Sequence, residues 1–424
     1  MNENPYLLPV NKHGINPLVI IATLFFIFGF VTWLNGILIP FLKIACGLTL
    51  YVEAIMVTFA FYMSYVVMAA PSSWVLHKVG FKQGISLGLA IMALGSLVFI
   101  PAALSRSFII FLSGLFIQGA GLTLLQTAVN PYVTLLGPTE SAARRISIMG
   151  ICNKVAGVIG PLVMGAIVLK GSDQLIGQLN VVSDSNKIII LNHLAQRIIL
   201  PYIIMTFVLV LLAIMVWFTH LPEIETDTKE DFITADGTRR TNIFQFPGLI
   251  IGFISLFLYV GVEVIAGDTI VPYGQAQGIT LDIARKFTTL TLASMVIGYI
   301  IGILTIPRYI KQHNALAISA ILGIVLSLAA IFTSGYTSVC CIGLLGLANA
   351  VMWPAIWPLA ISNLGKFTKS GSALLIMGIA GGATIPLLYA YLTDVFHNFQ
   401  EPYWIMVPIY SFIFYFAVAG HKLK

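Results

Sequence analysis

Charge is scarce in this 424-residue chain. Only 9% of the residues are Asp, Glu, Lys or Arg, whereas soluble domains carry about 25%. Hydrophobic residues make up 58%, and the mean hydropathy is +0.97. This balance excludes a soluble globular core and indicates a chain that crosses the membrane many times. The small excess of base, 22 Lys and Arg against 16 Asp and Glu, is spread over short loops, so we expect no nucleic-acid partner.

The signatures of several other protein classes are also missing. The four cysteines, Cys46, Cys152, Cys340 and Cys341, lack the spacing of a disulfide framework or a metal site. A phosphate-binding P-loop motif is absent, which argues against an ATP-driven pump. The first 14 residues lack the pattern of a cleaved signal peptide. We therefore expect no enzyme, no cofactor and no metal site, and we read the first apolar run as a membrane span.

What the chain does contain is long apolar runs. Twelve of them approach the roughly 20 residues that a membrane-spanning helix needs. They cover residues 17–42, 50–76, 83–104, 108–136, 146–169, 194–219, 245–272, 286–307, 314–333, 337–362, 371–393 and 402–420. The most polar stretch, residues 220–242, separates the first six from the last six. We predict an all-α membrane protein with twelve transmembrane helices in two six-helix bundles, at residues 1–220 and 245–424, joined by a linker at 221–244.

Basic residues and an internal repeat support this division. With the N-terminus in the cytoplasm, fourteen Lys and Arg face inward and seven outward, with Lys154 left inside a span. The positive-inside rule then places both termini and the linker in the cytoplasm. The tetrapeptide Ile148–Ile151 recurs as Ile376–Ile379, 228 residues later, on the fifth and eleventh spans. Two parallel halves with a site between them is a common plan among secondary transporters.

Amide side chains occur at membrane depth on several spans. Gln126 and Asn130 are one helical turn apart on the fourth span and share a face. Asn35 lies on the first span and Asn153 on the fifth. Such amides often bond to neighbouring helices, and they can also line a polar wall for a hydroxylated solute. We favour the wall, because a charged residue and an aromatic pair accompany them.

Lys154 is that charged residue. A lysine at the centre of a span costs roughly 2.5–3.5 kcal/mol, so it needs a partner or a wet cavity. It lies about ten residues, or 15 Å, beyond Arg144 and Arg145, too deep to reach the interface easily. Glu263 and Asp268 on the seventh span are candidate partners. A purely structural ion pair is the alternative; we expect Lys154, Glu263 and Asp268 to serve ion coupling, with Glu263 also binding substrate.

The tenth span offers an aromatic surface. Trp353 and Trp357 are four residues apart and lie on one helix face, after Asn349 and among Pro354 and Pro358. Aromatic faces pack against the C–H patches of sugars, while amides and carboxylates bind their hydroxyls, as in pockets that mix apolar surface with a few polar groups. Lipid-facing aromatics would be the alternative, but Pro354 and Pro358 place the pair in a broken helix segment and not in an interfacial belt. We predict a substrate pocket made of Asn35, Gln126, Asn130, Asn153, Glu263, Asn349, Trp353 and Trp357.

Four segments carry recognisable motifs: Trp33–Pro40 (WLNGILIP), Gln126–Pro138 (QTAVNPYVTLLGP), Tyr259–Glu263 (YVGVE), and the run from Trp353 through Asn363-Leu364-Gly365 to Gly381-Gly382. They resemble the fucose:proton symporter family of the major facilitator superfamily, with the glucose/galactose transporters as the closest branch. The resemblance implies the major facilitator fold, a central sugar site and ion-coupled uptake.

The chain departs from that family at the residues that carry protons. Fucose:proton symporters place an Asp in the first motif and a Glu in the second, where this chain has Gly36 and Gln126. Lys154 also replaces a small polar residue that usually follows the matching Asn153. Our hypothesis is that Glu263, Asp268 and Lys154 took over the coupling.

The sequence thus predicts a secondary transporter that imports a neutral hexose of the glucose, galactose, mannose or fucose type, coupled to protons or sodium. We expect a monomer in the bacterial inner membrane, with sugar and membrane lipid as its partners. Three alternatives stay open: a facilitative uniporter, a sugar sensor of the same fold that does not transport, and an exporter of drugs or anions.

Overall fold

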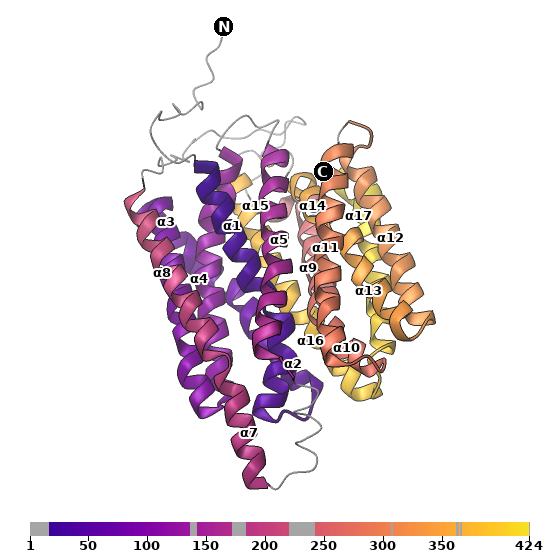
Figure 1. Cartoon of the computed structure of the whole chain (residues 1–424). Coiled ribbons are helices and arrows are strands. Elements are labelled where there is room, and N and C mark those ends of the chain that lie inside the picture. The colour runs from indigo at the N-terminus through magenta and orange to yellow at the C-terminus, as the bar shows by residue number, and fades with distance from the viewer. Residues whose placement is uncertain are drawn as a thin grey trace.

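The chain is described by a computed structural model that covers residues 17–135, 142–171, 184–219, 242–306, 308–361, 364 and 367–423. Helices dominate this described part of the chain (Figure 1). Twelve of its helices are long and apolar enough to cross a membrane. The all-α prediction and the number of spans are therefore confirmed.

The first half follows the predicted order of spans. Its helices are α1 (Pro17–Trp33), α2 (Asn35–Cys46), α3 (Tyr51–Ser105), α4 (Phe108–Leu135), α5 (Ala142–Val168), α7 (Asp184–Gln196) and α8 (Ile199–Phe218). The predicted second and third spans are both contained in α3, which is broken at Gly80 (φ 77°). Glycine adopts such a positive φ without steric cost, so the chain reverses there between two spans.

The second half contains more interrupted helices. It consists of η2 (Ile243–Gln245), α9 (Pro247–Asp268), α10 (Ile270–Ala276), α11 (Leu281–Thr305), α12 (Gln312–Phe332), α13 (Gly335–Asn349), α14 (Met352–Ile361), α15 (Thr368–Met377), η4 (Gly378–Ala380), α16 (Gly381–Phe396), η5 (Glu401–Ile405), α17 (Met406–Val418) and η6 (Gly420–Lys422). The tenth span changes from α13 to α14 just before Trp353 and Pro354, where we expected a broken helix. The eleventh span tightens into η4 around its glycines, which lets it bend.

The two halves lie side by side, with helices of the first half on the left of Figure 1 and those of the second half on the right. Their most extensive contacts join α3 to α16 and α5 to α11. These two pairs are equivalent under a parallel duplication, since they join the second span to the eleventh and the fifth to the eighth. Large apolar side chains are exposed on the outer faces, as on α8, where Phe207 is 67% exposed. This pattern is expected for helices that contact lipid.

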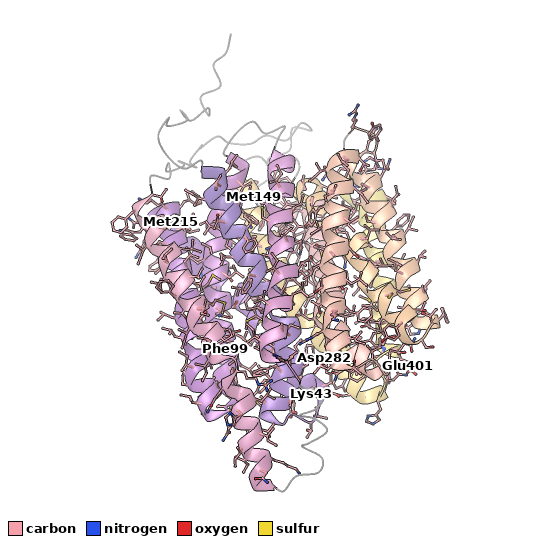
Figure 2. The ribbon with its side chains drawn as sticks, viewed as in Figure 1. Lys43, Phe99, Met149, Met215, Asp282 and Glu401 are labelled. Atoms are coloured by element: carbon pink, nitrogen blue, oxygen red, sulfur yellow. The ribbon has the colours of Figure 1, made fainter. Side chains whose placement is uncertain are left out.

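The bundle has two ends that matter below. The start of α1 and the C-terminus lie at one end, which we call the terminal end (Figure 1). The opposite end, which we call the distal end, contains the start of α3 and the ends of α5 and α16. In Figure 2, Lys43, Asp282 and Glu401 lie toward the distal end, and Met149 and Met215 toward the terminal end. The predicted linker lies almost wholly outside the described residues, so the domain boundaries stay a prediction.

Candidate functional site

The most unusual feature of the interior is a buried ion pair between the halves. Lys154 Nζ of α5 donates a hydrogen bond to Glu263 Oε1 of α9 at 2.6 Å. The two residues are only 7% and 8% exposed. Lys154 lies 12 residues into α5 and Glu263 lies 16 residues into α9, which places the pair about 18–24 Å from the helix starts. The pair therefore sits deep inside the bundle, far from either end.

Trp33 also contacts Lys154. The Lys154 Nζ lies 4.3 Å from the centroid of the Trp33 ring, within the range of a cation–π interaction. The ring lies between two glycines from opposite halves. A Cβ at Gly157 would come within 2.5 Å of Trp33, and one at Gly267 within 2.3 Å. Glycine is needed at both positions because any side chain there would collide with the indole.

Sequence reasoning did not include Trp33 in the pocket, although its motif was recognised. The helix ends at this residue: α1 stops at Trp33, and α2 begins at Asn35 after a one-residue break at Leu34. Broken helices at membrane depth are the usual place for a binding site in transporters. No second tryptophan lies one turn away from Trp33, so only the tertiary structure shows that its ring lies between Gly157 and Gly267.

Asp268 belongs to a separate polar contact. Its Oδ2 accepts a hydrogen bond from Thr58 Oγ1 of α3 at 2.9 Å, and the residue is only 1% exposed. Glu263 and Asp268 are five residues apart on α9, so their side chains point about 140° apart around the helix. The structure therefore splits the predicted trio into a Lys154–Glu263 pair and an Asp268–Thr58 pair, each of which joins the two halves.

The predicted aromatic pair stacks as its spacing requires. The Trp353 and Trp357 rings lie 5.5 Å apart with an interplanar angle of 21°. The centroid of the Tyr259 ring of α9 lies 6.5 Å from that of the Trp353 ring. Tyr259 precedes Glu263 by one helical turn. The same helix therefore carries the acid of the ion pair and an aromatic contact to the tryptophans.

The predicted amides have different surroundings. Asn349 is fully buried, and its Oδ1 accepts a hydrogen bond from Tyr410 at 2.9 Å, while its Nδ2 has no partner among the described residues. Asn153 Nδ2 donates to the Phe25 carbonyl of α1 at 3.4 Å. Gln126 and Asn130 are half-buried on α4. Asn35 begins α2, but its side chain is outside those described. Their roles in a pocket stay predictions.

Two cavities of appreciable size lie elsewhere. One, of about 610 Å³, is lined by Tyr309–Lys311 and part of α12; the other, of about 470 Å³, lies between Lys170 and α8. Neither includes a residue of the predicted pocket. Among the described residues, no group of three or more His, Cys, Asp or Glu could hold a metal ion.

This arrangement can perform a specific kind of chemistry. A lysine and a glutamate from different halves neutralise each other where water is scarce, and removing one partner from such a pair leaves a costly buried charge. A relative movement of the halves that separates the pair must therefore bring in water, a polar ligand or an ion to replace the lost contact. The site can thus couple ligand occupancy to the arrangement of the halves.

Comparison with known proteins places this geometry in a family. The model of the Major Facilitator Superfamily matches residues 21–383. The chain is 31% identical over 405 residues to a glucose/galactose transporter of Brucella abortus, covering 95% of this chain and 93% of the relative. It is 29% identical over 414 residues to the L-fucose-proton symporter of Escherichia coli, covering 96% and 93%.

Solved structures agree with this assignment. The major facilitator transporter FucP in its outward conformation matches with a TM-score of 0.74 and 28% identity, over 95% of this chain and 98% of that one. A D-xylose-proton symporter shares the fold, with a TM-score of 0.67 and 16% identity over 96% and 98%. The chain therefore belongs to the Major Facilitator Superfamily, in the group of the glucose/galactose transporters and the fucose:proton symporters.

Proposed function

We propose that this protein imports a neutral hexose of the glucose, galactose, mannose or fucose type by alternating access of its two halves, coupled to a cation. The observation that carries the proposal is the buried Lys154–Glu263 hydrogen bond, which joins the halves deep in the bundle. The names of the relatives, a glucose/galactose transporter and an L-fucose-proton symporter, support the substrate class.

The sugar would bind between the stacked Trp353–Trp357 surface and the ion pair. Sugar rings present C–H patches that suit an indole face, and hydroxyls that suit amides and carboxylates. Glu263 would accept hydrogen bonds from sugar hydroxyls once its contact with Lys154 loosens. The amides proposed to complete the pocket are Asn35, Gln126, Asn130, Asn153 and Asn349.

Asp268 is our candidate for the cation-coupling residue. Glu263 already has a counter-charge in Lys154, whereas the contact defined for Asp268 is a hydroxyl, that of Thr58. A buried carboxyl beside a hydroxyl is a suitable place for a proton or a sodium ion to neutralise charge. Lys154 and Glu263 would respond to the same cation-binding step. The carboxyls of Glu263 and Asp268 lie on one helix, α9, and each contacts a residue of the first half.

A facilitative uniporter is a second candidate, and one observation favours it. The positions that hold acids in fucose:proton symporters are Gly36 and Gln126, which do not titrate. If the ion pair stays closed through the cycle and Asp268 binds no cation, the protein would only equilibrate sugar across the membrane.

We further propose that both termini and the linker between the two six-helix bundles face the cytoplasm of a bacterium, with the protein in the inner membrane. The count of basic residues supports this orientation. The distal end would then face outward. A monomer would suffice, because the proposed site lies between two halves of one chain.

Uptake into proteoliposomes tests the proposal. We expect labelled hexose to accumulate when an inward proton or sodium gradient is imposed, and to equilibrate without one. Counterflow exchange with no accumulation under either imposed gradient would indicate the uniporter. Sugar binding with neither accumulation nor counterflow would contradict transport and indicate a sensor.

A further inference from the structure

At the distal end of the bundle, a carboxylate from the second half caps a helix of the first half. The first N–H groups of any helix have no partner within it. At the start of α3, Glu53 Oε2 accepts from the N–H groups of Thr49 and Leu50, both at 3.1 Å. Asp394 of α16 binds the next two N–H groups. Its Oδ1 accepts from the backbone N–H of Tyr51 at 3.0 Å, and its Oδ2 accepts from that of Val52 at 2.7 Å.

Aromatic rings from both halves surround this cap. The Tyr51 ring lies 4.9 Å from that of Phe399 and 6.4 Å, edge to face, from that of Tyr389. Tyr51 is only 2% exposed. A carboxylate with both oxygens bonded to a positive helix end, in partly dry surroundings, forms a stronger contact than a surface ion pair.

A second contact occurs at the other interface between the halves. Arg285, near the start of α11, donates from Nη1 to the Gly165 carbonyl near the end of α5 at 2.6 Å. Its Nη2 lies 3.2 Å from Asp282 of its own helix. The C-terminal end of a helix is electronegative and favours a cation, as its N-terminal end favours an anion.

These two contacts lie at equivalent places in the duplicated fold. Asp394 is at the end of the eleventh span and meets the start of the second; Arg285 is at the start of the eighth and meets the end of the fifth. Each charge matches the helix dipole that it faces. Both contacts join the two halves at the distal end, and both would break if the halves separated there.

We propose that Asp394 and Arg285 are the positioning residues of an external gate, which hold the distal end closed while sugar leaves on the other side. They touch neither the ion pair nor the tryptophans. The inference rests on the proposed import by alternating access, since opening the distal end is the step that admits external sugar. Weakening either contact should therefore favour the outward-open arrangement.

Distances between the halves test this inference. In a variant with the four native cysteines replaced, spin labels at Leu104→Cys and Phe332→Cys, two exposed positions toward the distal end, report the separation by double electron–electron resonance. Asparagine has a single side-chain oxygen, so Asp394→Asn can accept only one of the two N–H bonds. We expect the ratio of the short-distance to the long-distance population of the spin labels to fall about tenfold. Arg285→Gln should shift it in the same direction, and both changes together should shift it further.

Two further variants separate a gate from general charge or folding effects. Val52→Pro removes the N–H that donates at 2.7 Å, at a position in the first helical turn that tolerates proline. Added to Asp394→Asn, it should cause little extra shift. Glu401→Gln removes an exposed charge at the same end and should leave the distances and the unfolding temperature unchanged.

The proposal is overturned if the wild-type protein is already mostly in the long-distance state. It is equally overturned if Asp394→Asn and Arg285→Gln leave the distribution unchanged, or if Glu401→Gln shifts it as much. If the Asp394→Asn variant does not fold, the Val52→Pro variant takes its place in the test. Unchanged distances in that variant would also contradict the gate. These measurements need neither sugar nor a gradient, so their failure is distinct from failure of the proposed uptake.

Discussion

At the scale of single residues, the interior tolerates the buried charges of Lys154 and Glu263 because they are paired with each other. The lysine has one carboxylate at 2.6 Å and the Trp33 ring at 4.3 Å. Taking both charges out of water is expensive, and the pair repays this cost only while both members are present. The pair is therefore a poor source of stability and a suitable switch, because a ligand that bonds to either member competes with the other.

We expect Lys154→Met to lower the free energy of unfolding by about 3–5 kcal/mol, because Glu263 would be left buried without its counter-charge. Adding Glu263→Gln should restore most of the loss. Thermal unfolding in detergent, read as a double-mutant cycle, measures this coupling. Lys78→Met, at an exposed lysine, is the control. A loss in the double variant equal to the sum of the losses in Lys154→Met and Glu263→Gln alone would show that the pair is not coupled.

Asp268→Asn tests the coupling role at the second buried acid. The amide oxygen can still accept from Thr58, so the fold should be kept, but the charge is gone. We expect gradient-driven accumulation of sugar to fall to an equilibrium ratio of one, with counterflow retained. Glu401→Gln serves as a control with normal accumulation. Accumulation that survives in Asp268→Asn and disappears in Glu263→Gln would move the coupling role to the ion pair.

Trp353→Ala tests the aromatic surface. Removing one ring of a pair stacked at 5.5 Å deletes both the stack and the apolar area offered to a sugar, so we expect the half-saturating sugar concentration to rise about tenfold. Trp353→Phe should recover part of the affinity. Trp217→Ala, at a tryptophan 52% exposed on α8, should change nothing. An unaltered half-saturation in Trp353→Ala would exclude this residue from the pocket.

At the scale of helices, close approach depends on glycine. The Cβ of any residue at position 381 would lie 1.7 Å from the Phe257 carbonyl oxygen of α9, whereas at Gly378 the nearest atom is 3.4 Å away. Small residues let membrane helices approach until their backbones touch, and this packing replaces the hydrophobic force that is absent in lipid. After η4 (Gly378–Ala380) the span continues as α16, which packs against α3 of the other half.

This contrast gives a matched pair of variants. Gly381→Ala forces the backbones of α16 and α9 apart, and we expect it to destabilise the protein by about 1–3 kcal/mol. Gly378→Ala adds the same methyl group three residues away, where it makes an ordinary contact, and should be tolerated. Unfolding temperatures of the two variants in the same detergent compare them directly. Similar temperatures would mean that the helices have room to move apart.

At the scale of the whole molecule, the two halves are joined by polar contacts at two depths. The pairs Lys154–Glu263 and Thr58–Asp268 are buried within the bundle, and Asp394 and Arg285 act at the distal end. The orientation of the bundle decides whether that end faces the medium, and so whether the proposed gate admits sugar from outside.

Labelling of single cysteines checks this orientation. We expect a membrane-impermeant maleimide added to intact cells to label Glu401→Cys, at the distal end, and to label Lys311→Cys, at the terminal end, only after permeabilisation. Both positions are exposed, so access to the reagent and not burial decides the outcome. The native cysteines are replaced in both variants. The opposite pattern would reverse the proposed topology and with it the direction of the gate.

The sequence alone determined the number of spans and their order along the chain. Bilayer thickness sets the length of an apolar run, and this is a local property that can be read without knowing any contact. The break before Trp353 was predicted for the same reason, since proline removes a backbone donor wherever it occurs in a helix. The costly residues, Lys154, Glu263 and Asp268, were also visible, because charge inside a span is rare.

Only the tertiary structure decided how these residues pair. Depth and helix rotation bring Glu263 to Lys154 and turn Asp268 toward Thr58, although both acids lie on α9. Trp33 and Asp394 gained their surroundings in the same way, from glycines and backbone N–H groups of helices far away in the sequence. Such contacts depend on how two halves of one chain are placed against each other, and no local pattern encodes that placement.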